Sequence, residues 1–132
     1  MFLSHIKGVN YMLVAIVGVC ASGKSTLVKN LRDFGIDAYN VAQEHSCIKK
    51  FWQRRKPDVV IMIDVTLEAI RKRRNVSWDE QRLIVQHERL EDAKQNADLY
   101  IQTDLLSKEM VVQKVLDFIR RKENAENNNR NA

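Results

Sequence analysis

Short apolar runs alternate with amphipathic segments along most of the chain. Residues 11–17 form a continuous apolar run, and three further strand-like segments cover residues 36–41, 58–65 and 99–103. Continuous apolar runs of this length are typical of strands buried on both faces of a sheet. The pattern therefore predicts four strands.

Apolar residues at helical spacing fill the intervals between these strands. Residues 25–34 carry such a stripe, and Gly35 supplies a stop signal. A second helix, carrying Cys47, Ile48, Phe51 and Trp52, is expected to end before Pro57. Three more helices are expected, with N-terminal caps at Thr66, Ser77 and Ser107.

This alternation of strands and helices predicts an α/β fold. We expect a short, mostly parallel sheet of about four strands, with right-handed crossovers and helices on both faces. Ligands of such sheets bind beyond the carboxyl ends of the strands. That rule selects four loops as the candidate site, at residues 18–24, 41–46, 64–66 and 103–107.

The organisation of the 132-residue chain is predicted to be that of a single domain. Residues 1–10 lack a clear period and are interpreted as an N-terminal extension. Residues 11–122 form the domain, and residues 123–132 are expected to be a disordered polar tail, because they offer almost nothing to bury.

Composition and charge narrow the function classes further. No apolar run approaches membrane-spanning length and no leader pattern precedes the domain, so no membrane partner is expected. The two cysteines, Cys20 and Cys47, suggest neither a disulfide framework nor a spaced metal motif, and they favour a cytoplasmic location. The net charge of +5 is concentrated in two basic clusters, at residues 49–56 and 71–74. A nucleic-acid partner is not expected, because Phe51 and Trp52, the aromatic residues within the first cluster, are assigned to a buried helix stripe rather than to base stacking.

The most specific motif is G-x-x-x-x-G-K-[ST] at residues 18–25, placed between the first predicted strand and helix. Such a loop directs backbone N–H groups and a helix N-terminus at phosphate. Lys24 is expected to reach the β- and γ-phosphates, and the Ser25 hydroxyl to hold Mg²⁺. The predicted nucleotide-binding residues of this loop are Gly18, Cys20, Ala21, Ser22, Gly23, Lys24, Ser25 and Thr26.

From this loop onward the chain resembles the small-molecule kinase branch of the P-loop nucleoside triphosphatases. Three segments carry the resemblance: Gly18–Thr26, Val60–Arg74 and Ala97–Asp104. It implies a three-layer P-loop fold with ATP and Mg²⁺ as cofactors. It also implies that Thr103 and Asp104 lie beside the adenine. The lid arginines that stabilise the transferring phosphoryl group would be Arg71, Arg73 and Arg74.

The chain departs from that branch in length, because too few residues separate Val41 from Val60 for the usual extra strand–helix unit. That unit normally supplies an acidic residue for Mg²⁺. Asp64, after a four-residue apolar run, is the favoured replacement, and Glu44 is the alternative, since it follows a strand that would then neighbour the first. Glu44 could also act as a base on the acceptor side, together with His45; the simpler interpretation of this segment is a solvated helix cap.

The leading functional hypothesis is an ATP- and Mg²⁺-dependent phosphotransferase acting on a small metabolite or nucleotide that the sequence does not identify. No guanine-recognition motif of the Asn/Thr-Lys-x-Asp type occurs, which favours ATP. The alternative is a nucleotide-binding or slowly hydrolysing regulatory NTPase without kinase activity, because a kinase needs a walled acceptor pocket that excludes water. The sequence leaves the oligomeric state open.

Overall fold

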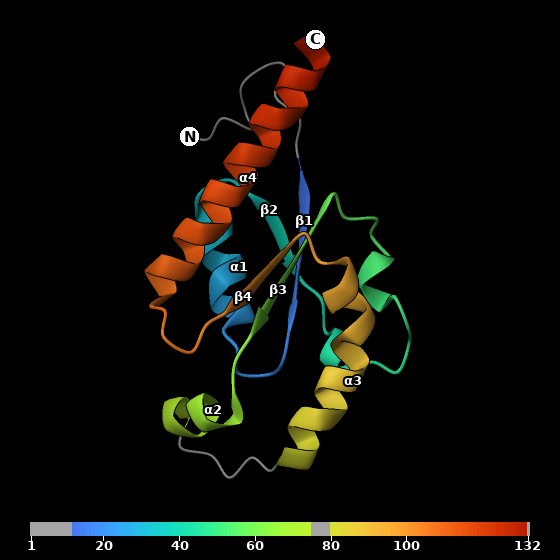
Figure 1. The fold of residues 1–132 in the computed structure, drawn as a ribbon, viewed down its shortest axis with the longest axis vertical. Coiled ribbons are helices and arrows are strands. Elements are labelled where there is room, and N and C mark those ends of the chain that lie inside the picture. Colours follow the sequence, from blue (N-terminus) through green and yellow to red (C-terminus); the bar gives the residue numbers. More distant parts are fainter. Residues whose placement is uncertain (1–11, 75–79, 132) are drawn as a thin grey trace.

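A computed structural model describes residues 12–74 and 80–131, and the side chains of residues 12–73 and 80–126. Its centre is a four-stranded sheet in the order β2-β1-β3-β4, in which every neighbouring pair is parallel (Figure 1). The strands are β1 (Leu13–Gly18), β2 (Asp37–Asn40), β3 (Val59–Asp64) and β4 (Leu99–Gln102). This confirms the predicted α/β class and parallel sheet.

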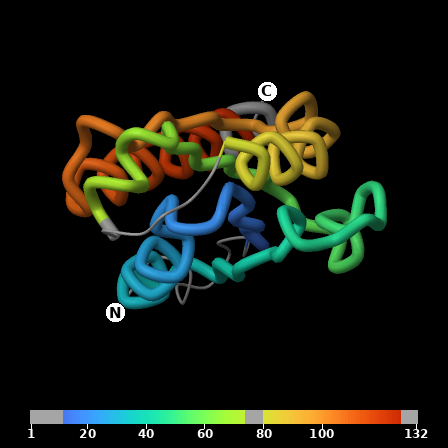
Figure 2. Tube along the Cα trace, turned by 90° about the horizontal axis from the view of Figure 1, so that it is seen from below, coloured from blue at the N-terminus to red at the C-terminus, as the bar shows by residue number. Residues whose placement is uncertain are grey.

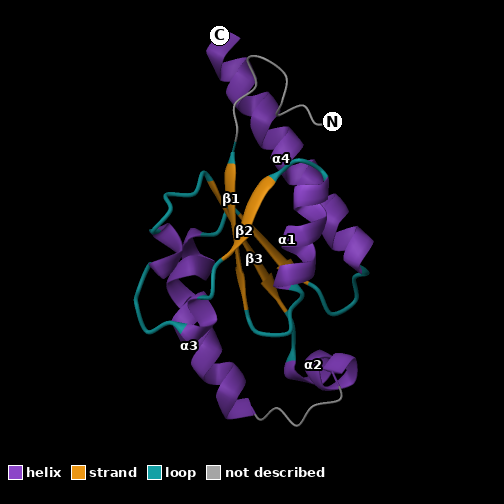
Figure 3. Ribbon diagram, turned by 180° about the vertical axis from the view of Figure 1, so that it is seen from behind, coloured by secondary structure: helices purple, strands orange, loops and turns teal. Residues whose placement is uncertain are grey.

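Helices cover both faces of the sheet, as Figures 1 and 3 show. On one face, α1 (Lys24–Asp33) and α4 (Lys108–Asn131) pack against the side chains of β1 and β3 that include Ile16 and Ile61. On the other face, α3 (Glu80–Asn96) covers a second apolar cluster. Because successive strand side chains point to opposite faces, the two central strands must be apolar throughout.

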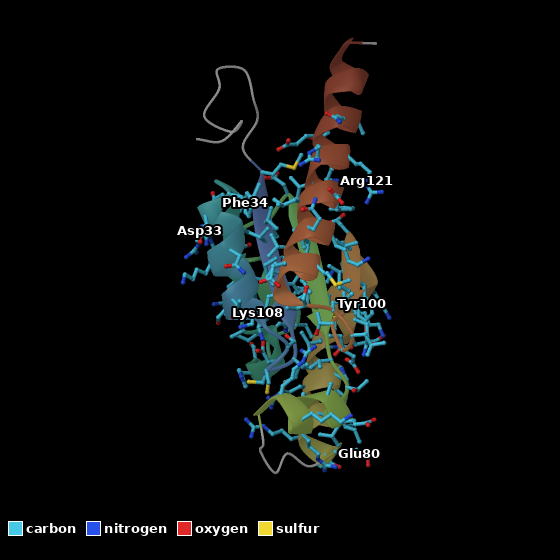
Figure 4. All side chains as sticks on the ribbon, turned by 90° about the vertical axis from the view of Figure 1, so that its left-hand side faces the viewer. Asp33, Phe34, Glu80, Tyr100, Lys108 and Arg121 are labelled. Carbon is cyan, nitrogen blue, oxygen red and sulfur yellow. The ribbon has the colours of Figure 1, made fainter. Side chains whose placement is uncertain are left out.

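The carboxyl ends of the strands meet at one end of the molecule, where α2 (Leu67–Arg74) also lies (Figure 1), and Figure 2 views the molecule from this end. Figure 4 places Glu80, at the start of α3, at this same end and Arg121, in α4, toward the opposite end. The predicted caps of α2 and α4 are confirmed. The Thr66 hydroxyl accepts a hydrogen bond from Ala69 N at 3.2 Å, and the Ser107 hydroxyl accepts one from Met110 N at 3.1 Å.

The helix predicted around residues 47–53 was wrong. The structure has the 3₁₀ turn η3 (Phe51–Gln53) there, preceded by a second 3₁₀ turn, η2 (Gln43–His45), and Ile48 is half exposed. Lys50 adopts a left-handed conformation with φ of 58°, which interrupts any helix. The buried Gln43 side chain fixes the segment in this form by donating to Ile48 O at 2.9 Å and accepting from Trp52 N at 3.0 Å.

The structure also differs at the C-terminal end, where α4 continues to Asn131 in place of the disordered tail predicted from residue 123. Neither glycine nor proline, the two residue types least favourable in a helix interior, follows Lys108. The extension predicted at residues 1–10 and the cap at Ser77 lie outside the described residues. Among the residues that are described, no helix is both long and apolar enough to cross a bilayer.

Candidate functional site

A tight loop joins β1 to α1 at the carboxyl end of the sheet, and we call residues 18–25 the glycine loop. Gly18 packs so closely on β3 that a Cβ atom there would lie 2.2 Å from the carbonyl oxygen of Ile63. Gly23 precedes α1 with φ of 98°, and Ala21 has φ of 66°. Left-handed residues at alternate positions curl the backbone around a small concavity, which is the form of an anion-binding nest.

Lys24 lies buried beneath this loop, with 7% of its surface exposed. Its ammonium donates to Gly18 O at 2.9 Å and to Val19 O at 3.3 Å. The third partner is the carboxylate of Glu44, with which it forms a buried ion pair. The side chain therefore ties the start of the glycine loop to the segment that follows β2.

Glu44 reaches Lys24 because β2 pairs directly with β1, so the segments after these two strands are neighbours. Glu44 is 2% exposed, and its Oε1 atom has no hydrogen-bond partner within the part of the chain that the structure describes. The Arg89 guanidinium of α3 donates to Glu44 O at 3.2 Å. The loop that carries the carboxylate is thus held from both sides, by Gln43 within it and by α3 outside it.

The other polar side chains of the glycine loop are those of Cys20, Ser22 and Ser25. The Cys20 sulfur lies 3.2 Å from His45 Nε2, and the backbone N–H of Cys20 donates to the buried Gln86 side chain at 2.9 Å. On the α1 side, the Asn40 amide donates to the Ser25 hydroxyl at 3.2 Å. Ser22 is 3% exposed, and its hydroxyl is without a partner among the described atoms.

Asp64, the carboxylate expected to serve Mg²⁺, is engaged elsewhere. Its Oδ1 atom accepts from Val65 N at 2.9 Å and lies 3.0 Å from His87 Nε2, while Oδ2 accepts from the Tyr100 hydroxyl at 2.7 Å. Partial burial, followed by this hydrogen bond to Asp64, raises the pKa of Tyr100 well above its ordinary value. Asp64 therefore joins β3 to α3 and β4, whereas Glu44 is the carboxylate that contacts Lys24.

A pocket of about 410 Å³ opens between the glycine loop and the start of α4. Its walls include Ser22 and Thr26 on one side and Thr103 and Lys108 on the other. Arg73 of α2 also lines it and donates to both the hydroxyl and the carbonyl oxygen of Thr103. One wall of this pocket is thus provided by the loop after β1 and the other by the loop after β4.

The remaining predicted residues divide between this pocket and its surroundings. Asp104 does not line the pocket; it accepts bonds from the backbone and hydroxyl of Thr66 at 3.0 and 2.5 Å. Burial opposes ionisation of Asp104, but the hydrogen bonds from Thr66 and Gln102 outweigh it and lower its pKa. Arg71 is exposed on α2, and the side chain of Arg74 lies outside the described part.

Sequence reasoning missed the contribution of α3, whose Gln86 and Arg89 contact the glycine loop and the Glu44 segment and whose His87 contacts Asp64. No motif marks these residues, because their partners are distant in sequence. Comparisons of the chain with protein-family models, with curated proteins and with solved structures find no match.

Proposed function

We propose that the chain is a Mg²⁺-dependent phosphotransferase that uses ATP, with residues 18–25 as its phosphate-binding loop and a small metabolite or nucleotide as acceptor. The observation that carries the proposal is the buried Lys24 ammonium beneath the glycine loop, paired with the buried Glu44 carboxylate. A buried cation whose partners are two backbone carbonyls and one displaceable carboxylate is suited to receive phosphate oxygens.

The backbone around Lys24 also suits an anion. Helix α1 has no side-chain hydrogen bond at its N-cap and no acidic residue in its first turn, so its first N–H groups remain available for a ligand. The buried Ser22 hydroxyl, unpartnered among the described residues, is a further donor in the same loop. Together these groups fit the β- and γ-phosphates of a nucleotide whose remainder occupies the adjacent pocket.

Among the predicted metal residues, Ser25 fits Mg²⁺ and Asp64 does not. The Ser25 hydroxyl lies in the first turn of α1, and Mg²⁺ commonly combines few protein oxygens with substrate phosphates and waters. Both Asp64 oxygens are already engaged by Val65, His87 and Tyr100. When bound, Mg²⁺ would supply charge neutralisation on the phosphate oxygens.

The chain's own residues then have separate tasks. Lys24 moves from Glu44 to the phosphates, which leaves the carboxylate without its cation. Glu44 can then accept the proton of an acceptor hydroxyl. Arg73 lines the nucleotide pocket from α2 and stabilises the charge that spreads over the transferring group.

One observation favours the alternative, a regulatory NTPase that binds or slowly hydrolyses ATP. Because β2 lies directly beside β1, the sheet has no strand–helix unit between them to wall an acceptor pocket. The two functions differ in whether an acceptor changes turnover.

The deciding experiment follows ADP release from MgATP by the full chain, with and without fractionated pools of metabolites and nucleotides. A phosphotransferase should show acceptor-dependent ADP release together with a phosphorylated product in mass spectra. Lys24→Ala is the inactive control. If no pool raises ADP release above the rate of hydrolysis, the kinase proposal fails; if the parent and Lys24→Ala also bind MgATP equally, nucleotide binding at this loop fails too.

A further inference from the structure

Three side chains of different chemistry converge beside the glycine loop. Cys20 comes from the loop itself, and Glu44 and His45 come from η2. One potential ligand atom from each of them lies within 4.8 Å of the other two, and we call this group the Cys–Glu–His cluster. The cysteine sulfur and the imidazole Nε2 are 3.2 Å apart, and that nitrogen is 3.8 Å from Glu44 Oε2.

These distances are close to those between ligand atoms that bind one metal ion. Tetrahedral zinc sites have bonds of about 2.3 Å to sulfur and about 2.0 Å to nitrogen or oxygen, which place sulfur and nitrogen about 3.5 Å apart and nitrogen and oxygen about 3.3 Å apart. The two observed distances differ from these values by a few tenths of an ångström, in opposite directions. A cation can therefore be accommodated by side-chain rotations that also release Glu44 Oε2 from the Lys24 ammonium.

The Glu44 carboxylate has a second oxygen, Oε1, whose acceptor capacity is unused by the residues that the structure describes. Glu44 is 2% exposed, and its Oε1 atom is buried without a partner in the described structure. A buried polar atom that forms no hydrogen bond is costly, and a cation would supply the missing interaction. His45 remains half exposed, which gives an ion a path from solvent to the buried carboxylate.

The cluster is also held in place by groups that would not bind the ion. Gln86 of α3 accepts from the Cys20 backbone, and Arg89 donates to the Glu44 carbonyl. The loop that carries Cys20 and the segment that carries Glu44 and His45 are therefore both positioned by α3. Fixed ligands of this kind reduce the ordering that metal binding requires.

We propose that the Cys–Glu–His cluster binds one divalent cation of the zinc class, separate from the Mg²⁺ expected at Ser25. Thiolate and imidazole ligands select such ions over Mg²⁺, which prefers oxygen. Three protein ligands leave a fourth position open to water or to an anion at the glycine loop. The ion competes with Lys24 for Glu44, and while the ion is bound Glu44 cannot serve as the proton acceptor proposed above. This site goes beyond the proposed phosphotransfer function.

The probe is Co²⁺ alone, titrated into the reduced full-length chain without nucleotide. We expect one equivalent to give the charge-transfer absorption of a cobalt–thiolate bond, and Zn²⁺ to abolish that absorption by displacement. Cys20→Ser should remove the band, and the matched control Cys47→Ser, at the exposed second cysteine, should keep it. His45→Ala should weaken binding at least tenfold. A band that persists in Cys20→Ser, or no band in the parent protein, overturns the proposal.

Lys24→Met tests the carboxylate ligand by a gain of affinity. Removing the ammonium frees Glu44, so Co²⁺ should bind several-fold more tightly, whereas the double variant Lys24→Met/Glu44→Gln should lose that gain. An unchanged or weaker affinity in Lys24→Met would show that Glu44 is not a ligand. Thermal melts of the metal-free variants verify that each one folds. Because no nucleotide is present, the result is independent of whether the chain binds ATP.

Discussion

Lys24 and Glu44 form an ion pair in which both side chains are almost completely removed from solvent. The pair links the loop after β1 to the loop after β2, and it occupies the ammonium that the proposed nucleotide would need. Charges buried in this way depend on each other, because neither has bulk water as a substitute partner. The first two predictions separate this structural role from the proposed binding role.

Lys24→Ala should abolish measurable MgATP binding and should also destabilise the protein. The loss of the ammonium leaves Glu44 buried without its counter-ion, which typically costs about 3–5 kcal/mol. The double variant Lys24→Met/Glu44→Gln should recover most of that stability but no nucleotide binding. Urea denaturation and isothermal titration calorimetry measure the two effects. Nucleotide binding that returns with stability would show that Lys24 has no direct role.

Glu44→Gln should change ATP binding and phosphoryl transfer in opposite directions. The amide competes less strongly than a carboxylate for Lys24, so MgATP should bind several-fold more tightly. The amide cannot accept a proton from the acceptor, so acceptor-dependent turnover should fall. The measurements are titration of MgATP and product formation at saturating ATP. Weaker MgATP binding would contradict the competition between Glu44 and phosphate.

Arg73→Ala should slow phosphoryl transfer by about 10³-fold while changing ATP affinity much less, because an arginine that meets developing phosphoryl charge acts mainly in the transition state. Arg71→Ala is the matched control. It lies on the same helix, but only Arg73 is among the residues that line the pocket. Equal effects of the two substitutions on turnover would argue against a specific role for Arg73.

Gly18→Ala should destabilise the fold more than Gly23→Ala. The new methyl group at position 18 would meet a backbone oxygen of β3 at 2.2 Å, whereas at position 23 it meets nothing within 4 Å. We expect a cost of about 3 kcal/mol for Gly18→Ala, from overpacking against a rigid strand. Strain from the left-handed conformation at Gly23 should cost about 1 kcal/mol. Urea denaturation of the two variants compares these costs, and the reverse order would mean that the loop does not press on β3.

Tyr100 should ionise at higher pH than an ordinary tyrosine, because burial and the adjacent Asp64 carboxylate disfavour the phenolate. The unfolded chain releases this proton near pH 10, so folding stability should fall as pH rises above that value. Spectroscopic titration of phenolate absorbance should show a late step that Tyr100→Phe removes. A late step that survives in Tyr100→Phe would assign it to another tyrosine.

The fold was largely predictable because its signals are local. Continuous apolar runs identified β1 and β3, and Thr66, Ser107 and Gly35 marked helix ends by their own backbone or side-chain chemistry. The segment after β2 was mispredicted as a helix because its apolar spacing is helical. The hydrogen bonds of the Gln43 side chain decide its conformation, and they depend on tertiary position rather than on periodicity.

The part of the candidate site that lies within one loop could be predicted from the sequence. The contacts between segments distant in sequence were harder to predict. The glycine loop followed from its motif, and Glu44 was recognised as an alternative acid from the shortened connection. The preference for Asp64 relied on a strand-end pattern that cannot reveal its engagement by His87 and Tyr100. The cysteine spacing indicated no metal motif, and it could not indicate that Cys20 lies close to a histidine and a glutamate from another loop.

Strand β3 positions both halves of the site, the glycine loop and the helix that carries Arg73, because Gly18 packs closely on Ile63. The glycine loop is set against the backbone of this strand, and α2, which carries Arg73, follows directly from its carboxyl end. The spacing between the proposed phosphate loop and the arginine proposed to meet the transferring group is therefore set by one strand. We expect substitutions that shift β3 to disturb both halves of the site at once.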